Sequence, residues 1–277
     1  MIDHLKKLMA TELRRATRMR RFAFLELFAG GAHLSGALRD AGYAVVSLDI
    51  RNGALEDHLH PAFWGVIRGW LQGGVIIGVW LGTPCTTWSR ALRRPLRSIE
   101  APMGLEDLSP SELSRLQVGN DTFRLSVRVL DTCVRLGIPA YLENPSASIM
   151  WHAPLLEPLL QRPDCYVHIL DMCRFGTPWR KRTKIAMWGA GFHPHLHVRC
   201  TGKGGLCSVS GKPHLVLEGV DPRTGLKRTA VAAAYPKSLS RALARTLRLV
   251  AENNHSINRH SWALGVKPAD FSLQARS

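Results

Sequence analysis

Two reactive side chains and one glycine turn each follow directly on an apolar, strand-like run. Cys85 follows "VWLGTP", Glu143 lies in "YLENPSAS", and Gly30-Gly31 separates "FAFLELFA" from "AHLSGALRDAG". A thiolate can act as a nucleophile, and a carboxylate can hold or move a proton. A glycine turn lets the backbone approach a ligand closely. Since a lone cysteine or a tight turn is often only structural, the interpretation depends on whether these residues meet.

An acidic side chain extends this pattern. The run "YAVVSLDI" ends near Asp49, which follows Gly30 by 19 residues and is placed to bind the ribose hydroxyls of a nucleoside-like cofactor. The turn lacks the G-x-G-x-x-G spacing of a dinucleotide site, which disfavours NAD. The stretch "GLCSVSGKP" is not a P-loop, because it has one residue too many and a proline where serine or threonine is required.

The elements that must position these residues alternate along the chain. Apolar runs predict strands, and helical apolar spacing predicts helices; we expect strands at 22–28, 43–50, 74–82, 138–144, 165–173 and 183–190, and helices at 3–21, 32–42, 59–72, 111–136 and 236–254. This alternation predicts a doubly wound α/β fold with a mostly parallel sheet. Because the carboxyl ends of parallel strands open onto one edge, the thiol, the carboxylate and the glycine turn should converge there.

The composition indicates a polyanionic partner. The 277 residues include 37 Lys and Arg against 21 Asp and Glu, a formal net charge of +16. Such an excess favours phosphate polyanions over a neutral partner. The basic N-terminus lacks the apolar core of a signal peptide, no apolar run is long enough to cross a membrane, and the six cysteines contain no C-x-x-C pair. We therefore expect an intracellular monomer with reduced thiols and no membrane partner, nuclear in a eukaryote and otherwise in the cytoplasm or nucleoid.

The order of five motifs resembles the cytosine-C5 DNA methyltransferase family. These are FAGG, a strand-end acid, GTPC, ENP and "FGTPWRKRTKI", spread over residues 22–190, with a return in the helix near 235–252. The variant motifs are most similar to the short, divergent members that mobile elements and viruses encode. The resemblance implies a Rossmann-like, S-adenosylmethionine-dependent fold. It divides the chain into a basic lead-in helix (1–21), a catalytic core (22–190), a small irregular basic insert for target recognition (191–232), a terminal helix (233–254) and a loosely ordered tail (255–277).

The family's chemistry would assign a role to each motif. Cys85 would add to C6 of cytosine, and Glu143 would hold N3 and the exocyclic amine of a base flipped out of double-stranded DNA. Lys181 falls on the family's first arginine of this motif and Thr183 on its second, and Arg182 would compensate for them. The resemblance places the remaining contacts in two sets: S-adenosylmethionine would contact Phe28, Gly30, Gly31, Asp49 and, at its adenine, Asp57, whereas DNA would contact Ser89, Arg90, Arg93, Arg94 and Arg97.

Two alternatives to DNA methylation remain open. RNA undergoes the same thiol addition, and an inert DNA-binding relative would explain the altered arginine motif. Retention of both Cys85 and Glu143 argues against an inert protein, because a binding module needs neither. We also expect the arginines after Cys85 to favour its thiolate, and Trp88 to pack in the core, with contact to DNA as the alternative.

The insert carries a candidate metal site, and the sequence leaves open whether it binds a metal. Cys200, Cys207 and His214, with a histidine from 193–197, could form a tetrahedral zinc site that stabilises a segment too small for its own core. The alternative is a polar basic loop whose histidines contact DNA or solvent. The other cysteines, Cys133, Cys165 and Cys173, are expected to be structural.

Overall fold

The computed structural model describes residues 1–90, 92 and 94–263, with side chains as far as residue 254. Its strands lie close to the predicted ranges: β1 (Ala23–Leu27), β2 (Ala44–Leu48), β3 (Ile76–Leu81), β4 (Ala140–Pro145), β5 (Cys165–Asp171) and β6 (Arg182–Trp188). The final helix, α7 (Lys237–Ala263), extends past the predicted end at 254. The tail expected from 255 therefore begins inside a helix, and its part from 264 onwards lies outside the described residues.

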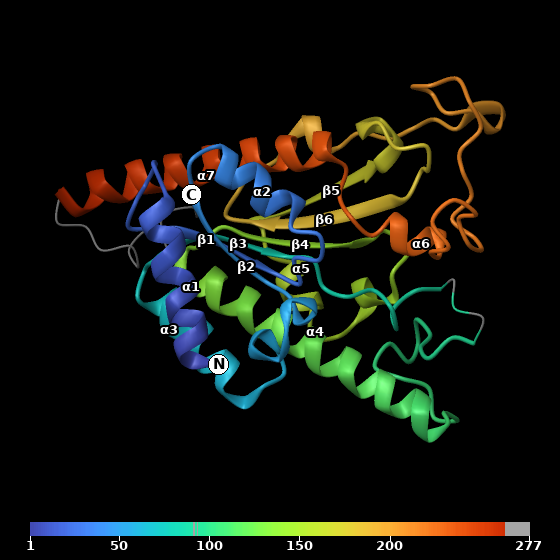
Figure 1. The fold of residues 1–277 in the computed structure, drawn as a ribbon, viewed down its shortest axis with the longest axis horizontal. Helices are drawn as coiled ribbons and strands as arrows, with labels where there is room; N and C mark the ends of the chain where they lie inside the picture. Colours follow the sequence, from blue (N-terminus) through green and yellow to red (C-terminus); the bar gives the residue numbers. More distant parts are fainter. Residues whose placement is uncertain (91, 93, 264–277) are drawn as a thin grey trace.

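The strands form one sheet in the order β2-β1-β3-β4-β6-β5 (Figure 1). Strands β1 to β4 are parallel, and β6 is antiparallel to both of its neighbours. The expectation of a Rossmann-like α/β fold with a mostly parallel sheet is confirmed. Strand β6 departs from the parallel pattern because the segment 172–181 that joins it to β5 is too short for a helical crossover.

Helices cover both faces of the sheet, with α1 (Ile2–Arg15), α3 (Pro61–Gln72) and α4 (Pro110–Leu136) on one side, and α2 (His33–Asp40) and α7 on the other (Figure 1). The strands are buried on both faces, so alternate residues of β1 enter different cores. Leu25 and Leu27 pack toward α3, whereas Phe24 packs with Tyr43 and Trp80 toward α7. Burying each such side chain stabilises the fold by about 1.5–3 kcal/mol. None of the described helices is long and apolar enough to cross a membrane.

The parallel strands end at nearly the same level. Leu27 pairs with Leu48 on one side and Leu81 on the other, and Leu81 pairs with Leu142. The glycine turn and the Cys85 loop leave the sheet at this edge, and the Glu-Asn-Pro segment continues β4 there, paired with β6. The topology therefore brings together three segments that are far apart in the sequence.

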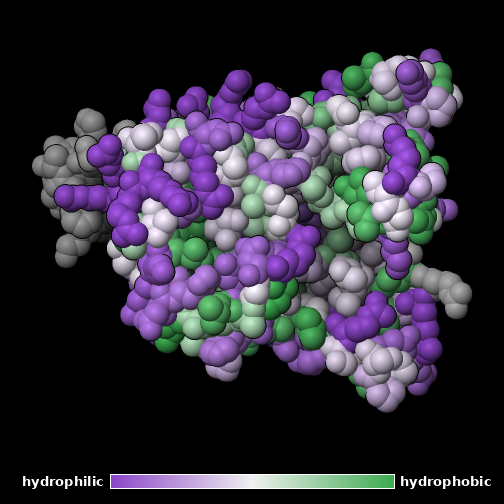
Figure 2. All heavy atoms as spheres, in the orientation of Figure 1, coloured by the Kyte–Doolittle hydropathy of each residue, from purple (hydrophilic) through white to green (hydrophobic). Residues whose placement is uncertain are grey.

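The insert, residues 191–232, contrasts with this core. Its regular structure within the described chain consists of short helical turns, two isolated β-bridges and one four-residue helix, α6 (Arg228–Val231). Several apolar side chains in it are exposed, including Val209, Val216 and Leu226, and hydrophobic surface is visible over this part of the molecule in Figure 2. The insert thus lacks a hydrophobic core of ordinary size.

Candidate active site

The loop that carries Cys85 leaves the carboxyl end of β3 and is anchored by hydrogen bonds. Asn144 Nδ2 donates to the carbonyl oxygen of Thr83 at 2.7 Å, and the hydroxyl of Thr83 lies 2.8 Å from that of Ser126. Asn144 belongs to the same Glu-Asn-Pro segment as Glu143. This segment therefore positions the thiol loop as well as carrying the carboxylate.

Glu143 has one oxygen bound by the protein and one without a partner. Tyr235 Oη donates to Glu143 Oε2 at 2.9 Å and accepts from Trp80 Nε1 at 3.2 Å. Glu143 Oε1 is buried and has no hydrogen-bond partner among the described residues. Burial raises the pKa of Glu143, whereas the charge of Lys181 and the hydrogen bond from Tyr235 act to lower it. A buried, unsatisfied carboxylate oxygen of this kind indicates a site that binds a polar ligand group.

Lys181 connects the carboxylate to the thiol electrostatically. Its charge acts to lower the pKa of both Cys85 and Glu143, and the charge of Glu143 acts to raise that of Cys85. Electrostatic effects weaken with distance, so the three side chains lie within electrostatic range of one another. Lys181 Nζ also donates to the carbonyl oxygen of Ala232 at 3.2 Å, which directs it inward. Lys181 and Glu143 thus both contact the segment 232–235, and the charges of both act on the thiol.

The expectation that its surroundings favour the thiolate of Cys85 is not met, because the pKa of this thiol is raised. The side chain is half-buried, and burial and the charge of Glu143 raise its pKa. The charge of Lys181 acts to lower it. The sequence favoured the arginines because they are near in the chain, whereas Lys181 is brought there by β6.

Arg97 does not have the predicted role in DNA binding. Its side chain is buried and donates to Thr87 Oγ1 at 3.0 Å, to Asn120 Oδ1 at 2.7 Å and to the carbonyl oxygen of Pro102 at 2.8 Å. The guanidinium also lies over the Trp88 ring, 3.5 Å from its centroid. The prediction is wrong because these donors are already used within the core. Trp88 is likewise fully buried, as its core interpretation predicted.

The other predicted DNA contacts remain predictions. Arg90 is exposed, and Ser89 is half-buried. Arg94 is exposed, but its Nε lies 3.3 Å from Glu112 Oε1. Arg93 lies outside the described residues.

Arg182 is directed away from the thiol site. Its Nε and Nη2 donate to the two oxygens of Asp171 at 2.9 and 3.1 Å, and this pairing raises the pKa of Arg182. Arg180 Nε donates to the same carboxylate at 3.4 Å. The prediction that Arg182 compensates for the altered motif is therefore wrong. Adjacent residues at the start of a strand point to opposite faces, so only Lys181 is directed to Glu143.

The glycine turn after β1 has an unusual backbone. Gly30 has a φ of +57°, and the non-glycine residues Phe28 and Ala32 also lie in the left-handed region at +59° and +51°. Such conformations cost free energy and cluster at functional sites. Asp49 Oδ2 accepts from Gly30 N at 2.7 Å, and Oδ1 accepts from Arg51 N at 2.9 Å. Burial acts to raise the pKa of Asp49, but these hydrogen bonds outweigh it and the pKa is lowered.

A cavity of about 380 Å³ extends from this turn to the thiol loop. Its wall includes Phe28 and Asp57, two of the predicted cofactor residues, and also Pro84 and Thr86 on either side of Cys85. Its volume lies within the range of small-molecule sites, about 300–1,000 Å³. The wall is completed mainly by His58 and Ile50 on one side and by Arg115, Val118, Gly119 and Thr122 of α4 on the other.

The remaining predicted cofactor residues, Gly30, Gly31 and Asp49, do not line this cavity. Gly30 and Gly31 closely follow Phe28 in the chain, and Asp49 directly precedes Ile50; Phe28 and Ile50 do line the cavity. The sequence missed Tyr235 and His58, whose ring lies 4.5 Å from that of Phe28 between centroids. Tyr235 is separated from Glu143 by 92 residues, so no local spacing could have indicated their contact.

Comparisons with known proteins reveal only distant likenesses. No family model and no curated protein match this sequence. Among solved structures, the methyltransferase EhMeth of Entamoeba histolytica matches with a TM-score of 0.39 and 10% identity over 62% of this chain and 54% of that one. S. pombe Dnmt2 methyltransferase matches with a TM-score of 0.35 and 13% identity, over 62% and 51% of the two chains. A mutant DNMT2 of Spodoptera frugiperda matches with a TM-score of 0.35 and 14% identity, over 60% of this chain and 50% of that one.

The chain spans about half the length of these solved structures. Likenesses this distant identify neither a family nor an activity, and both must come from the residues of the site.

Proposed function

We propose that this chain is an S-adenosylmethionine-dependent methyltransferase that acts on C5 of cytosine in DNA. The observation that carries the proposal is that Asn144, next to Glu143, binds the Cys85 loop, while Glu143 and Lys181 both contact the segment 232–235. A cavity whose wall includes Pro84 and Thr86 adjoins this loop. A binding protein has no need for a coupled thiol, carboxylate and ammonium group in one place. The order of sequence motifs supports cytosine as the base.

Two residues of the cavity wall suit the proposed cofactor. Phe28 would hold the adenine ring through its aromatic side chain, and Asp57 would bind the ring's polar groups through its carboxylate. When bound, S-adenosylmethionine supplies an electrophilic methyl group on a sulfonium. Asp49 supports this site indirectly, because its carboxylate holds the Gly30 turn through a hydrogen bond.

The chain's own residues would then carry out the addition and its reversal. Cys85 adds as a thiolate to C6 of cytosine, forming a carbon–sulfur bond and making C5 nucleophilic. Glu143 binds N3 and the exocyclic amine, using its unpartnered Oε1, and favours the protonation of N3 as charge develops. Once C5 carries the methyl group, its proton would pass to solvent water, the C5–C6 double bond would form again as the carbon–sulfur bond breaks, and the thiolate would be restored. Lys181 stabilises that thiolate.

DNA is the proposed polymer because the chain is strongly basic. The net charge of +16 favours a polyanion, and Arg90 is exposed beside the thiol loop. A base inside a duplex is inaccessible to a half-buried thiol, so the target must be flipped out or unpaired. RNA meets the same chemical requirements and is the competing outcome of the test.

In the decisive experiment, the purified chain is incubated with methyl-labelled S-adenosylmethionine in two separate reactions. One reaction contains random-sequence duplex DNA and the other contains RNA. We expect label in 5-methylcytosine of the DNA. Label in RNA alone would overturn the choice of polymer, and label in neither would overturn the proposed activity.

A covalent trap tests the nucleophile. In the presence of S-adenosylmethionine, a duplex containing 5-fluorocytosine should form a stable adduct with the wild-type chain, because after methyl transfer fluorine cannot leave C5 as a proton does. The matched Cys133→Ser variant, which alters a buried thiol elsewhere, should be trapped equally well, whereas Cys85→Ser should not. An adduct in the Cys85→Ser variant would contradict the assignment.

A further inference from the structure

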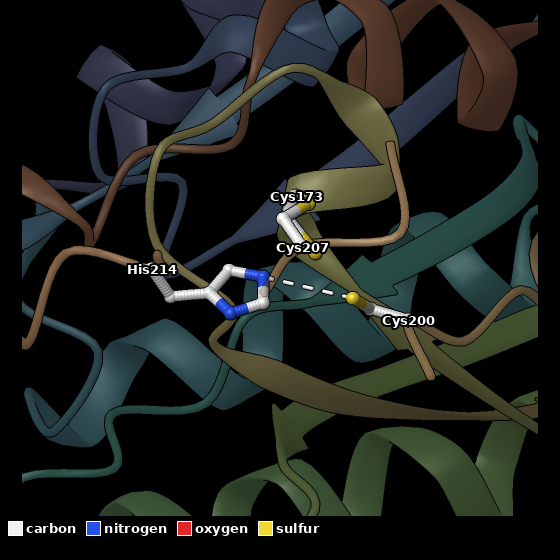
Figure 3. Close-up of side chains that lie close together, drawn as sticks. All are labelled: Cys173, Cys200, Cys207 and His214. Carbon is white, nitrogen blue, oxygen red and sulfur yellow. Dashed lines mark hydrogen bonds between the residues drawn. The ribbon is translucent and has the colours of Figure 1, made fainter. Parts of the chain in front are cut away.

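Three cysteines and one histidine from separate segments meet beside the insert. Cys173 lies in the short helical turn η4 (Met172–Phe175) after β5, and Cys200, Cys207 and His214 come from the insert (Figure 3). Their ligand-forming atoms all lie within 4.8 Å of one another. The three cysteines are buried and the histidine is half-buried. We call these four residues the cysteine–histidine cluster.

The donor set and its spacing match those of a structural zinc site. Zinc sites of this kind are tetrahedral and use four Cys or His ligands, with Zn–S near 2.3 Å and Zn–N near 2.0–2.1 Å, so the ligand atoms lie about 3.5–4 Å apart. Cys200 Sγ and His214 Nε2 are already 3.6 Å apart. Figure 3 shows the four side chains directed toward a common centre. Little movement would be needed to place one ion among them.

Neighbouring groups support the sulfur atoms as thiolates. Ser208 N and Oγ lie 3.3 and 3.4 Å from Cys200 Sγ, and Val209 N lies 3.5 Å from Cys207 Sγ. Hydrogen bonds to ligand atoms orient them and stabilise their charge. Gly211, with a φ of +66°, closes the turn by donating to the carbonyl oxygen of Cys207 at 2.9 Å.

The insert needs such a centre because it has little else to hold it. The cluster of buried apolar residues formed in this part of the described chain consists of Cys173, Cys200 and Cys207. Val209 and Val216 beside it are exposed. Segments without a core of their own are commonly stabilised by a metal or by disulfides. Three thiols in one cluster cannot all pair in disulfides, whereas all three can bind one ion.

We propose that Cys173, Cys200, Cys207 and His214 bind one Zn²⁺ ion that fastens the insert to the end of β5. The inference is independent of the proposed methyl transfer. Binding releases the protons of the three thiols, forms three zinc–sulfur bonds and one zinc–nitrogen bond, and involves no redox change. The four ligands fill the tetrahedral coordination, so the ion is structural rather than catalytic.

This ligand set corrects the one expected from the sequence. A histidine from 193–197 was to be the fourth ligand, but these side chains are used elsewhere. His193 Nε2 lies 2.8 Å from the carbonyl oxygen of Ala190, and His195 Nε2 lies 2.9 Å from Thr246 Oγ1. Cys173, expected to be only structural, takes the fourth position because the end of β5 brings it there.

The ion would also influence the thiol site through two hydrogen bonds. Cys200 N donates to Asp171 Oδ2 at 2.8 Å, and Asp171 holds Arg182. Met172 N lies 3.2 Å from the carbonyl oxygen of Lys181. The cluster is thus joined to the backbone that positions the ammonium group next to Cys85.

The test begins with the metal content of the whole chain, purified under reducing conditions without chelator. We expect about one zinc per chain by elemental mass spectrometry, as a single four-ligand site requires. Replacement by Co²⁺ should give the visible bands of tetrahedral cobalt together with thiolate charge-transfer absorption. X-ray absorption should report three sulfur ligands and one nitrogen ligand.

Matched variants locate the site. Cys207→Ser and His214→Asn should lose the stoichiometric metal. Cys165→Ser, which removes a thiol at the far end of β5, should keep it, and so should His197→Asn, which removes a rejected ligand candidate. If the first two variants fail to fold, the cobalt and X-ray absorption spectra of the wild-type chain still show whether three sulfur atoms and one nitrogen atom bind the metal.

Removal of the metal should have a local effect. When the metal is removed, the rate of amide hydrogen exchange should increase more in 172–181 and 199–216 than in β1 and β3. Three results would overturn the proposal: a reduced wild-type chain that binds neither Zn²⁺ nor Co²⁺, a native disulfide within the cluster, or equal metal loss in Cys165→Ser.

Discussion

The two regions of this molecule that contain grouped reactive side chains are held in different ways. Cys85 stands on a loop that runs from β3, in a sheet buried on both faces, to α4, and Asn144 of the neighbouring strand binds that loop directly. The cysteine–histidine cluster stands in an insert with almost no apolar core. In the first region, packing places the thiol; in the second, the thiols themselves must hold the chain in place.

This difference explains why the sulfur atoms have different surroundings. Cys85 is one thiol beside a carboxylate and a single ammonium group, a setting suited to making and breaking a bond. The cluster offers four ligand atoms to one point, a setting suited to permanent coordination. Cysteine chemistry in this chain is therefore decided by what supports each cysteine.

The largest expected effect is the loss of activity in Cys85→Ala. We expect methyl transfer to fall by a factor on the order of 10⁴ or more, because the addition to C6 has no other nucleophile. The affinity for S-adenosylmethionine, measured by calorimetry, should hardly change, and zinc content should remain the same. Equal activity in this variant would remove the proposed mechanism and the contrast between the two regions.

The second prediction concerns Glu26, which lies in β1 within the sheet. Burial raises its pKa to about 7, although hydrogen bonds from Ser35 act to lower it. The folded chain then binds a proton that the unfolded chain has released, so stability is fully present below about pH 4.5 and falls as the pH rises to about 7. Glu26→Gln should be more stable than wild type at pH 8, by up to about 3 kcal/mol, and similar at pH 4.

Urea unfolding at a series of pH values measures this effect. The matched comparison is Asp171, where burial acts to raise the pKa but the hydrogen bond from Arg182 contributes to lowering it overall. Its contribution has the opposite sign: it is present above the unfolded pKa and is lost as the pH falls through the folded one. An unchanged pH dependence in Glu26→Gln would contradict the assignment of the raised pKa.

The third prediction tests the link between the two regions. Asp171→Asn should weaken the pairing with Arg182 and Arg180, whose side chains are 37% and 39% exposed. Because solvent screens these charges, we expect a loss of about 1–2 kcal/mol in the free energy of unfolding. Hydrogen exchange should increase near 172–182 and in the insert, and little in β1. A uniform increase over the sheet would show that the regions are not separately held.

The smallest expected effect is that of Tyr235→Phe. Loss of the hydroxyl removes the hydrogen bond that lowers the pKa of Glu143, so that pKa should rise. We expect methyl transfer to fall by about 3- to 10-fold, the size of one modest hydrogen bond. The pH dependence of kcat should shift to higher pH on the limb that reports Glu143. A lower rate with an unchanged profile would indicate a purely structural role.

Local pattern was sufficient for the strands and for the convergence of three loops. Burial on both faces makes the parallel strands read as continuous apolar runs, and parallel strands must end at one edge. Glu143 and Cys85 could be selected because each follows such a run. Local pattern did not predict the positions of Arg97 and Arg182. The residues next to them in the sequence reveal neither that Arg97 is buried nor that Arg182 pairs with Asp171.

The α/β alternation, the strands and the edge at which the reactive residues emerge could be read from the residues in order, since they depend on periodicity and on residues close in the chain. Three contacts could be found only in the folded molecule: Lys181 with the carbonyl oxygen of Ala232, Tyr235 with Glu143, and Cys173 with the cysteines of the insert. These contacts join residues far apart in the chain, and their geometry follows from packing whole elements together. The fold class of this chain thus follows from residues close together in the sequence, whereas the chemistry of its side chains depends on contacts between residues far apart in it.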